Sequence, residues 1–316
     1  MKYASIDIGT NTLRLLIAEA GTSRGIRPLI YKRAITRLGG DYKEEYGIAP
    51  ASAERTFKAL EDFKKTISDN GAAEVLATAT SVVRRAVNRE WFLAEVLKRT
   101  GIGIRVIQGD EEARLSLLGV LSVIKDGSAK KAVMDIGGGS TEFIFTDGVA
   151  LRGAWSMEMG VVHLTEKHLK SDPPGPSELK GLEDEVKGVI AELEALMKKG
   201  GVDRRDYSRA KGAVLVGTAG TITTLAAMDQ DLQEYDRERI NNYTLTKEKV
   251  RGMYRYLASL TLKEREKVLS LEKGREDLII PGSAITLQTM EAFGFDEIKV
   301  SDAGLLEGII LQRVKA

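Results

Sequence analysis

The chain of 316 residues contains no cysteine and only two histidines, His163 and His168. Without cysteine it can form no disulfide, no thiolate nucleophile and no cysteine metal cage, and two histidines exclude a histidine-rich metal site. These absences fit a reducing cytoplasm, which is the location we expect.

Neither sign of charge dominates, since 47 Lys and Arg against 46 Asp and Glu leave a formal net charge of +1. A basic surface for nucleic acid is therefore not expected. No run of 18 apolar residues occurs and Asp7 interrupts the first apolar stretch, so we expect neither a membrane span nor a signal peptide. The length predicts about two globular domains, at roughly 150 residues each.

Apolar runs at the start of the chain predict three strands, at 2–8, 13–18 and 28–33, with a glycine-bearing turn at 21–25. After them, helical and strand patterns alternate, which indicates parallel strands covered by helices and hence an α/β domain. The alternating elements are a helix at 51–68, a strand at 74–79, a helix at 89–99, a strand at 104–107 and a helix at 110–124.

The opening pattern returns after the polar break at 126–128. Asp7 and Asp135 each end an apolar strand and are followed by isoleucine, glycine and a hydroxyl-rich turn, so we interpret the chain as an internal duplication. The second half predicts strands at 131–136, 142–146, 149–155, 213–216 and 297–300, and helices at 177–199, 222–228, 247–259, 277–293 and 305–314.

Three glycine and hydroxyl turns follow strands, at 9–12, 137–141 and 217–221. Glycine lets backbone N–H groups converge on an anion, so such loops bind phosphate. Any one of them alone would be an ordinary turn, but three in one chain favour phosphate binding. None has the spacing of a dinucleotide fingerprint or of a P-loop. The candidate phosphate ligands are Gly9, Thr10, Asn11, Gly138, Gly139, Ser140, Gly217, Thr218 and Gly220.

Carboxylates stand beside these loops: Asp7 before the first, and Asp135 and Glu142 on either side of the second. Mg²⁺ prefers oxygen ligands and usually keeps several waters and substrate phosphate oxygens, so the three are candidate metal ligands. For Asp7 and Asp135 the alternative is a hydrogen bond that closes their own glycine turn. For Glu142 the alternative is the polar face of a strand.

Asp110, Glu111 and Glu112 lie in the first turn of an expected helix, with Asp110 as its N-cap, and helix electrostatics alone would favour acids there. Phosphate hydrolysis needs a group that orients and deprotonates water, and in a chain with no cysteine and few histidines a glutamate is the remaining candidate. Arg84 and Arg85 follow a strand end, and a guanidinium matches phosphate oxygens. Spacing does not say which of the two arginines would do so.

Together these motifs resemble the exopolyphosphatase/guanosine pentaphosphate phosphatase family over nearly the whole chain. The Glu111-Glu112-Ala113-Arg114 and Asp135-Ile136-Gly137-Gly138-Gly139-Ser140-Thr141-Glu142 motifs are its specific part, since other actin-like ATPases share only the glycine loops. Further motifs in the same order are Asp7 to Thr12, Ala79 to Arg84, Met159-Gly160, Leu164-Thr165-Glu166, Gly217 to Thr221, Pro281-Gly282 and Ser301 to Leu305.

The resemblance implies an α/β fold of two actin-like (ribonuclease H-like) domains with an interdomain cleft. We expect domain I at 1–126, with a C-terminal helix at 304–316 that packs back on it, and domain II at 127–303. Glu112 would be the general base, Asp135 and Glu142 would hold Mg²⁺ (or Mn²⁺) or position water, and Arg84 would bind phosphate. The catalytic residues would thus be Glu112 and Glu142.

The leading hypothesis is a phosphohydrolase that releases terminal orthophosphate from inorganic polyphosphate, or converts guanosine pentaphosphate to tetraphosphate. We expect short chains to be favoured because the sequence ends after the two-domain core, and because Leu306 and His163 stand where many relatives have arginine. The alternatives are an actin-like sugar or acetate kinase, and a non-catalytic sensor of guanosine tetraphosphate or polyphosphate. The expected partners are these compounds, with no nucleic acid and no membrane, and the sequence leaves a homodimer open.

Overall fold

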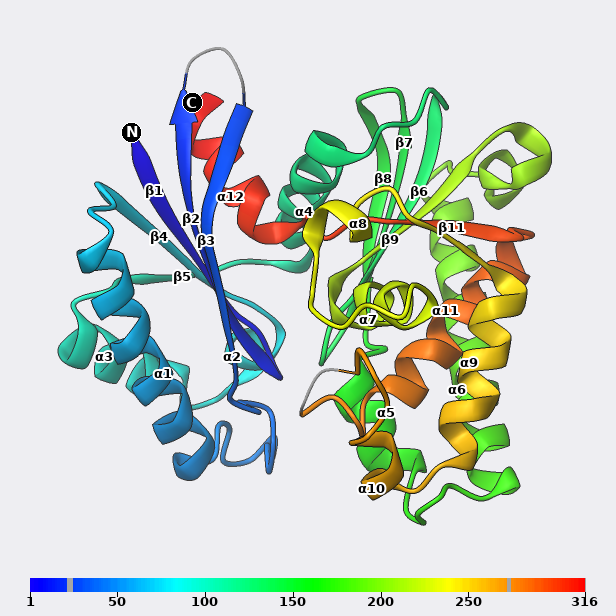
Figure 1. Ribbon diagram of the computed structural model, residues 1–316, viewed down its shortest axis with the longest axis horizontal. Helices are drawn as coiled ribbons and strands as arrows, with labels where there is room; N and C mark the ends of the chain where they lie inside the picture. Colours follow the sequence, from blue (N-terminus) through cyan, green and yellow to red (C-terminus); the bar gives the residue numbers. More distant parts are fainter. Residues whose placement is uncertain (22–24, 272–273, 316) are drawn as a thin grey trace. The chain divides into compact units, whose positions relative to one another are not determined.

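The computed structural model describes residues 1–21, 25–271 and 274–315, and the chain divides into two compact units (Figure 1). Unit 1 comprises Met1–Ser122 and Gly304–Ala316, and unit 2 comprises Val123–Ala303. The division lies between residues 122 and 123, slightly before the boundary expected after residue 126. The centre of the turn expected at 21–25 lies outside the described residues.

The sheet of unit 1 has five strands in the order β3-β2-β1-β4-β5. The first three are antiparallel neighbours, and β4 and β5 add in parallel. Alternation along β1 sends Ala4, Ile6 and Ile8 into the main core of the unit and Ser5 and Asp7 to the opposite face. The strands are β1 (Lys2–Ile8), β2 (Thr12–Gly21), β3 (Gly25–Ile35), β4 (Glu74–Ala79) and β5 (Ile104–Val106).

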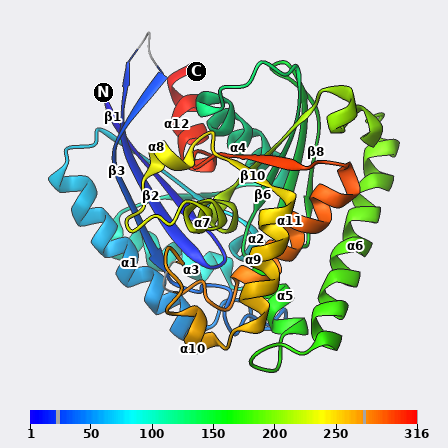
Figure 2. The same ribbon diagram turned by 45° about the vertical axis from the view of Figure 1, so that its right-hand side comes forward.

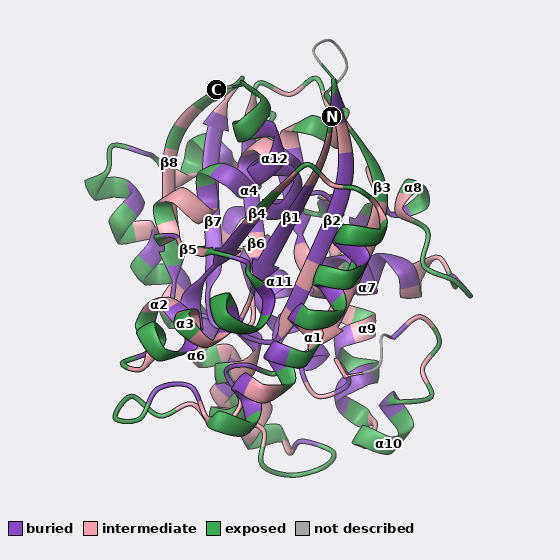
Figure 3. Ribbon diagram, turned by 90° about the vertical axis from the view of Figure 1, so that its left-hand side faces the viewer, coloured by how far each residue is buried: buried purple, intermediate pink, exposed green. Residues whose placement is uncertain are grey.

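Helices cover both faces of this sheet. The longest, α1 (Pro50–Asp69), begins with a proline whose fixed φ suits a first helical turn, and it buries Phe57, Leu60, Phe63 and Ile67 along one face. Figure 3 shows this contrast between buried strands and an exposed outer helix surface. The other helices of unit 1 are α2 (Ser81–Arg85), α3 (Arg89–Thr100), α4 (Gly109–Val123) and α12 (Leu305–Lys315).

Helix α12 returns to unit 1 from the far end of the chain. Its Leu306 and Ile310 pack with Leu16 and Ala18 of β2. The Ser5 hydroxyl of β1 also donates a hydrogen bond to the Leu306 carbonyl, at 2.9 Å. The C-terminal segment thus supplies part of the core of the first unit.

The sheet of unit 2 repeats the topology of the first. Its order is β10-β11-β9-β6-β7-β8, with β6, β7 and β8 antiparallel and β9 and β11 parallel to β6. Only the short edge strand β10 has no counterpart in unit 1 among the described residues, so the structure supports the duplication. The strands are β6 (Lys130–Ile136), β7 (Thr141–Asp147), β8 (Ala150–Met157), β9 (Val214–Thr218), β10 (Thr244–Thr246) and β11 (Glu297–Val300).

The helices of unit 2 differ in how far they are buried. α11 (Ile279–Phe293) is buried on almost every side, polar Ser283 and Thr286 included, whereas α6 (Pro176–Lys199) buries one stripe. The remaining helices are α5 (Val161–His168), α7 (Ala219–Asp229), α8 (Arg237–Ile240), α9 (Lys247–Ser259) and α10 (Leu262–Arg265), with 3₁₀ turns at Arg204–Tyr207 and Arg209–Lys211 (Figure 2). In the described part of the chain, no helix is both long and apolar enough to cross a membrane.

Candidate active site

The first glycine loop joins β1 to β2 in unit 1. The Gly9 N–H donates to the Thr12 carbonyl at 3.2 Å, and a Cβ on Gly9 would lie 3.0 Å from that same oxygen. The segment after β3 holds the loop from outside, since the Gly39 N–H donates to the Thr10 carbonyl at 2.8 Å. The loop conformation is therefore set before any ligand binds.

This loop carries buried polar atoms that bind nothing. Asp7 Oδ1, Thr10 Oγ1 and Asn11 Oδ1 have no hydrogen-bond partner in the described part of the molecule. Leaving such a group unsatisfied costs about 1–3 kcal/mol, so the arrangement fits a site that a ligand completes. Asp7 does not close its own turn; its Oδ2 accepts instead from Arg14 Nη2 at 2.6 Å and Nε at 2.9 Å.

Glu112 and Arg84 form an ion pair on the same unit. Arg84, on the short helix α2, donates through Nη1 to Glu112 Oε2 at 3.1 Å and to the Ile107 carbonyl at 2.9 Å. The Glu112 side chain is 12% exposed, and its neighbour Glu111 pairs instead with Arg105. Arg85 places its guanidinium over the ring of Tyr42. Of the two adjacent arginines, the structure thus directs Arg84 toward the candidate base.

The second loop joins β6 to β7 in unit 2 and is built like the first. The Gly137 N–H donates to the Ser140 carbonyl at 2.9 Å, as Gly9 does to Thr12. The start of α5 then holds the loop, because the Val162 N–H donates to the Gly138 carbonyl at 2.9 Å. A Cβ on Gly160 would lie 2.3 Å from that carbonyl, which explains the glycine of the Met159-Gly160 motif.

Asp135 and Glu142 lie on either side of this loop and face each other across the β6–β7 pair. Directly opposed residues of an antiparallel pair point to one face, with Cβ atoms about 4.5–5.5 Å apart. Glu142 is 2% exposed, and its Oε1 accepts from the hydroxyls of Ser140 at 2.8 Å and Ser156 at 2.7 Å. These two hydroxyls hold the Glu142 carboxylate in place.

This pair fits a magnesium ion better than it fits a closed metal cage. Mg²⁺ in phosphate-processing sites is held by one or two carboxylates, with water and substrate oxygens as its other ligands. Over residues 1–21, 25–271 and 274–315, no three His, Asp or Glu side chains gather as a metal cluster. Asp7, the third predicted ligand, belongs to unit 1, and its unpartnered Oδ1 is an acceptor that would suit a cation.

The third loop runs from the end of β9 into α7. Thr218 is the register partner of Asp135, so this loop begins beside the carboxylate pair. Ala219 has φ +69°, a left-handed conformation that non-glycine residues rarely adopt. The Thr218 hydroxyl donates to the Ala303 carbonyl at 3.2 Å, so this donor is already used within unit 2.

Arg275 also lies at the third loop, although no sequence pattern predicted it there. A Cβ on Gly220 would lie 1.4 Å from Arg275 Nη1, so the guanidinium rests directly on the backbone of the third loop. The available signal was an arginine in a charged stretch just before the apolar helix α11. That pattern alone does not distinguish it from surface charge, and only the fold brings it to the glycine loop.

The structure also places Leu306 and His163, the two positions at which we expected relatives to have arginine. Leu306 is 1% exposed and packs in the apolar cluster beneath α12, while His163 is exposed on α5. Leu306 therefore serves the core.

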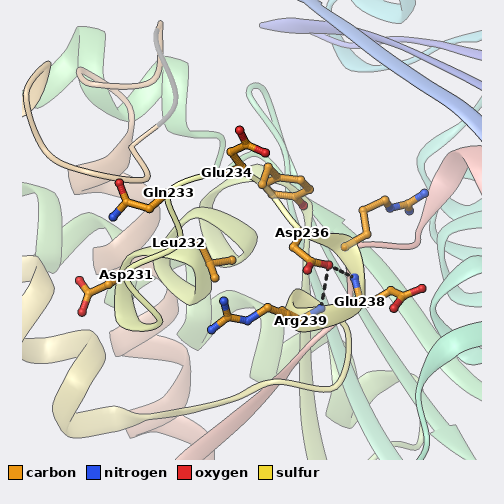
Figure 4. A pocket seen from close by; sticks show the side chains of 9 residues that line it. Asp231, Leu232, Gln233, Glu234, Asp236, Glu238 and Arg239 are labelled. Carbon is orange, nitrogen blue, oxygen red and sulfur yellow. Dashed lines mark hydrogen bonds between the residues drawn. The ribbon is translucent and has the colours of Figure 1, made fainter.

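A separate hollow of about 770 Å³ in unit 2 lies along residues 231–239 (Figure 4). Its polar groups serve the local structure: Asp236 accepts from the N–H groups of Glu238 and Arg239 to begin α8, and Tyr235 and Arg237 bind Asp302. No glycine loop lines this hollow, so the three loops remain the candidate phosphate sites.

Comparisons with known proteins identify relatives of this chain. Residues 16–316 match the model of the Ppx/GppA phosphatase family. The chain is 32% identical over 324 residues to exopolyphosphatase 2 of Mycobacterium tuberculosis, covering 98% of each. It is 27% identical to a guanosine-5'-triphosphate,3'-diphosphate pyrophosphatase of Aeromonas hydrophila, covering 98% of this chain but 58% of that longer relative. A solved Aquifex aeolicus PPX-GPPA enzyme superposes with a TM-score of 0.79 at 32% identity, covering 99% of each chain. The two mixed α/β sheets, the glycine loops and these matches establish that the chain belongs to the Ppx/GppA phosphatase family.

Proposed function

We propose that this chain is a Mg²⁺-dependent (or Mn²⁺-dependent) phosphohydrolase. It releases terminal orthophosphate from inorganic polyphosphate, converts guanosine pentaphosphate to tetraphosphate, or does both. The observation that carries the proposal is the Arg84–Glu112 pair. Glu111 also has an arginine partner, but that pair is more exposed, with 33% of the Glu111 side chain accessible against 12% for Glu112. A general base must be held in one orientation, and the more buried Arg84–Glu112 pair meets this need.

In the proposed reaction, water attacks the terminal phosphorus and the bridging P–O bond breaks, leaving the shortened phosphate chain as the leaving group. Glu112 accepts the proton of the attacking water. In unit 1 the proposed ligands of phosphate oxygens are the backbone N–H groups of the first loop and the guanidinium of Arg84, and in unit 2 they are the backbone N–H groups of the second and third loops. Arg84 can do both jobs, because its bonds to Glu112 and Ile107 use Nη1 alone.

Asp135 and Glu142 are the residues that would hold the metal ion, which would neutralise charge on the phosphate oxygens. Ser140 and Ser156 keep one oxygen of Glu142 fixed, so this carboxylate orients its neighbours without having to move. Short polyphosphates are the proposed preference, since neither Leu306 nor His163 supplies the fixed positive charge of an arginine.

One assay separates this function from its rivals. Phosphate release is measured with tripolyphosphate, long polyphosphate, guanosine pentaphosphate and ATP, without any acceptor. We expect orthophosphate from the polyphosphates or from the pentaphosphate. Preferential transfer to a sugar, acetate or ADP would instead identify a kinase, and tight binding without turnover would identify a sensor. The proposal also includes a cytoplasmic location, which the absence of cysteine fits. It further includes a homodimer, and light scattering tests this by measuring the molar mass in solution.

A further inference from the structure

Helix α4 carries Glu112 in its first turn. At two places its backbone contacts the backbone of the C-terminal segment directly. A Cβ on Gly308 of α12 would lie 1.7 Å from the Leu115 carbonyl oxygen of α4. A Cβ on Gly119 of α4 would lie 1.9 Å from the carbonyl oxygen of Gly304, just before α12. Real Cβ atoms essentially never come within 3.0 Å of such an atom. Glycine is therefore required at both contacts, and α4 and α12 lie side by side in Figures 1 and 2.

The C-terminal segment is itself firmly anchored. Glu307 is 3% exposed and its Oε2 accepts from the Gly304 N–H at 2.9 Å, which fixes the entry into α12. The bond from Ser5 to the Leu306 carbonyl and the packing of Leu306 and Ile310 attach α12 to the sheet. Helix α4 thus packs against a segment that is itself closely packed and hydrogen-bonded, and that is not easily displaced.

The contact between α4 and α12 is connected to the Arg84–Glu112 ion pair through shared neighbours. Leu115 of α4 packs with Leu305 and Ile309 of α12 and with Ile107, in one small apolar cluster. The carbonyl of Ile107 is also the second acceptor of Arg84. Arg84, Ile107 and α12 therefore surround the first turns of α4 and restrict where the Glu112 carboxylate can lie.

We infer that the C-terminal segment positions the catalytic carboxylate, with Gly308 and Gly119 as positioning residues that act through α4 on Glu112. This inference rests on the proposed role of Glu112 as the base. It assigns to a segment far away in the sequence a function in the chemical step, apart from its contribution to the core.

The size of the effect follows from the geometry. The distance from a Cβ on Gly308 to the Leu115 carbonyl oxygen would have to rise from 1.7 Å to at least 3.0 Å. The helices α4 and α12 must therefore move apart by a comparable amount. A misplacement of about 1 Å can cost on the order of 10²-fold in rate. The glycine loops do not take part in this contact, and the bonds of Arg84 to Glu112 and Ile107 use Nη1 alone, so substrate binding should change little.

The test is a double-mutant cycle on the full chain. For Gly308→Ala we expect kcat to fall roughly 10- to 100-fold, with KM within about twofold of wild type. Gly103→Ala is the matched control, because this glycine of unit 1 has no atom within 4 Å of its added Cβ and no positive φ; its kinetics should not change. In a Glu112→Gln background, Gly308→Ala should lower kcat by less than about twofold further, since the group it displaces is already disabled.

The outcomes separate the two ideas. If Glu112→Gln alone keeps wild-type kcat, the proposed base is wrong. If Glu112→Gln is inactive but Gly308→Ala keeps kcat, raises only KM, or lowers kcat equally in the Glu112→Gln background, the positioning inference is overturned. Should Gly308→Ala fail to fold, Ile309→Ala loosens the same contact without adding an atom. It should lower kcat at least about threefold with KM unchanged, and an unchanged kcat would equally refute the inference.

Discussion

At the scale of single residues, the site depends on side chains whose neighbours hold them in one orientation. Arg84 holds Glu112, Ser140 and Ser156 hold Glu142, and Arg14 binds one oxygen of Asp7. Preorganised groups of this kind avoid reorganisation during the reaction, which is where most electrostatic catalysis originates. Oδ1 of Asp7 has no hydrogen-bond partner among the described residues and remains available as an acceptor.

Replacement of Glu112 by glutamine keeps its volume and hydrogen bonding but removes its basicity. We expect kcat to fall on the order of 10²–10⁴-fold with little change in KM, the usual effect of losing a general base. Steady-state phosphate release measures both constants. Glu111→Gln is the matched control, since Glu111 pairs with Arg105 instead, and loss of activity in that variant alone would move the base to Glu111.

Asp135→Asn should raise the Mg²⁺ concentration needed for half-maximal activity, because one of the two facing carboxylates loses its charge. A titration of activity against Mg²⁺ measures the shift. Asp147→Asn, at the far end of the same strand pair, should leave the titration unchanged. Full activity in excess chelator would remove the metal from the mechanism.

At the scale of elements, local hydrogen bonds fix where helices begin. At the start of α6, Glu178 accepts from the Gly175 N–H at 2.6 Å and from the Lys170 N–H at 2.7 Å, and also binds the Ser171 hydroxyl. These hydrogen bonds lower the pKa of Glu178 to about 2, and the bond from Ser171 is the largest cause. They favour the ionised carboxylate over the protonated one.

This cap predicts a pH dependence. Because the pKa of Glu178 is lower in the folded than in the unfolded chain, its stabilisation is fully present above the unfolded value near 4.5 and is lost as pH falls toward 2. Glu178→Gln should therefore show a smaller decrease of melting temperature between pH 5 and about pH 2 than wild type does. Glu194→Gln, on the same helix, is the control. Parallel melting curves for Glu178→Gln and wild type over this range would disprove the cap's contribution.

At the scale of the whole molecule, charge and duplication set what the protein can bind. The net charge of +1 gives no long-range attraction for a polyanion, and the two units repeat one strand order with one kind of glycine loop. Each unit thus carries its own candidate phosphate-binding loops.

We accordingly expect kcat/KM per chain end to be at least as high for short polyphosphates as for long ones. Ionic strength should matter only moderately, since few cation–phosphate contacts outside the reacting end are expected. The measurement is kcat/KM against chain length at two salt concentrations. A steep rise with length that disappears in high salt would reveal a long basic track and contradict this prediction.

The amino-acid sequence by itself determined the three glycine loops, the carboxylates beside them, the internal duplication and the family. The loops and their carboxylates are local patterns, in which an apolar strand ends in glycine and hydroxyl residues. The duplication and the family follow from the recurrence and the order of these patterns, and none of this needs tertiary information. It also predicted most long helices and strands, while the short elements α2, α8, α10 and β10 were missed because they have too few residues to show a period.

Only the tertiary structure decided which partners the site residues have. It directed Arg84 rather than Arg85 to Glu112, placed Arg275 on Gly220, and buried Leu306 of the returning helix α12 against β2. These contacts join segments that lie far apart along the chain, and packing selects them from many arginines and leucines that look alike in sequence. Their identity depends on where whole elements come to rest, because no local propensity encodes a distant neighbour.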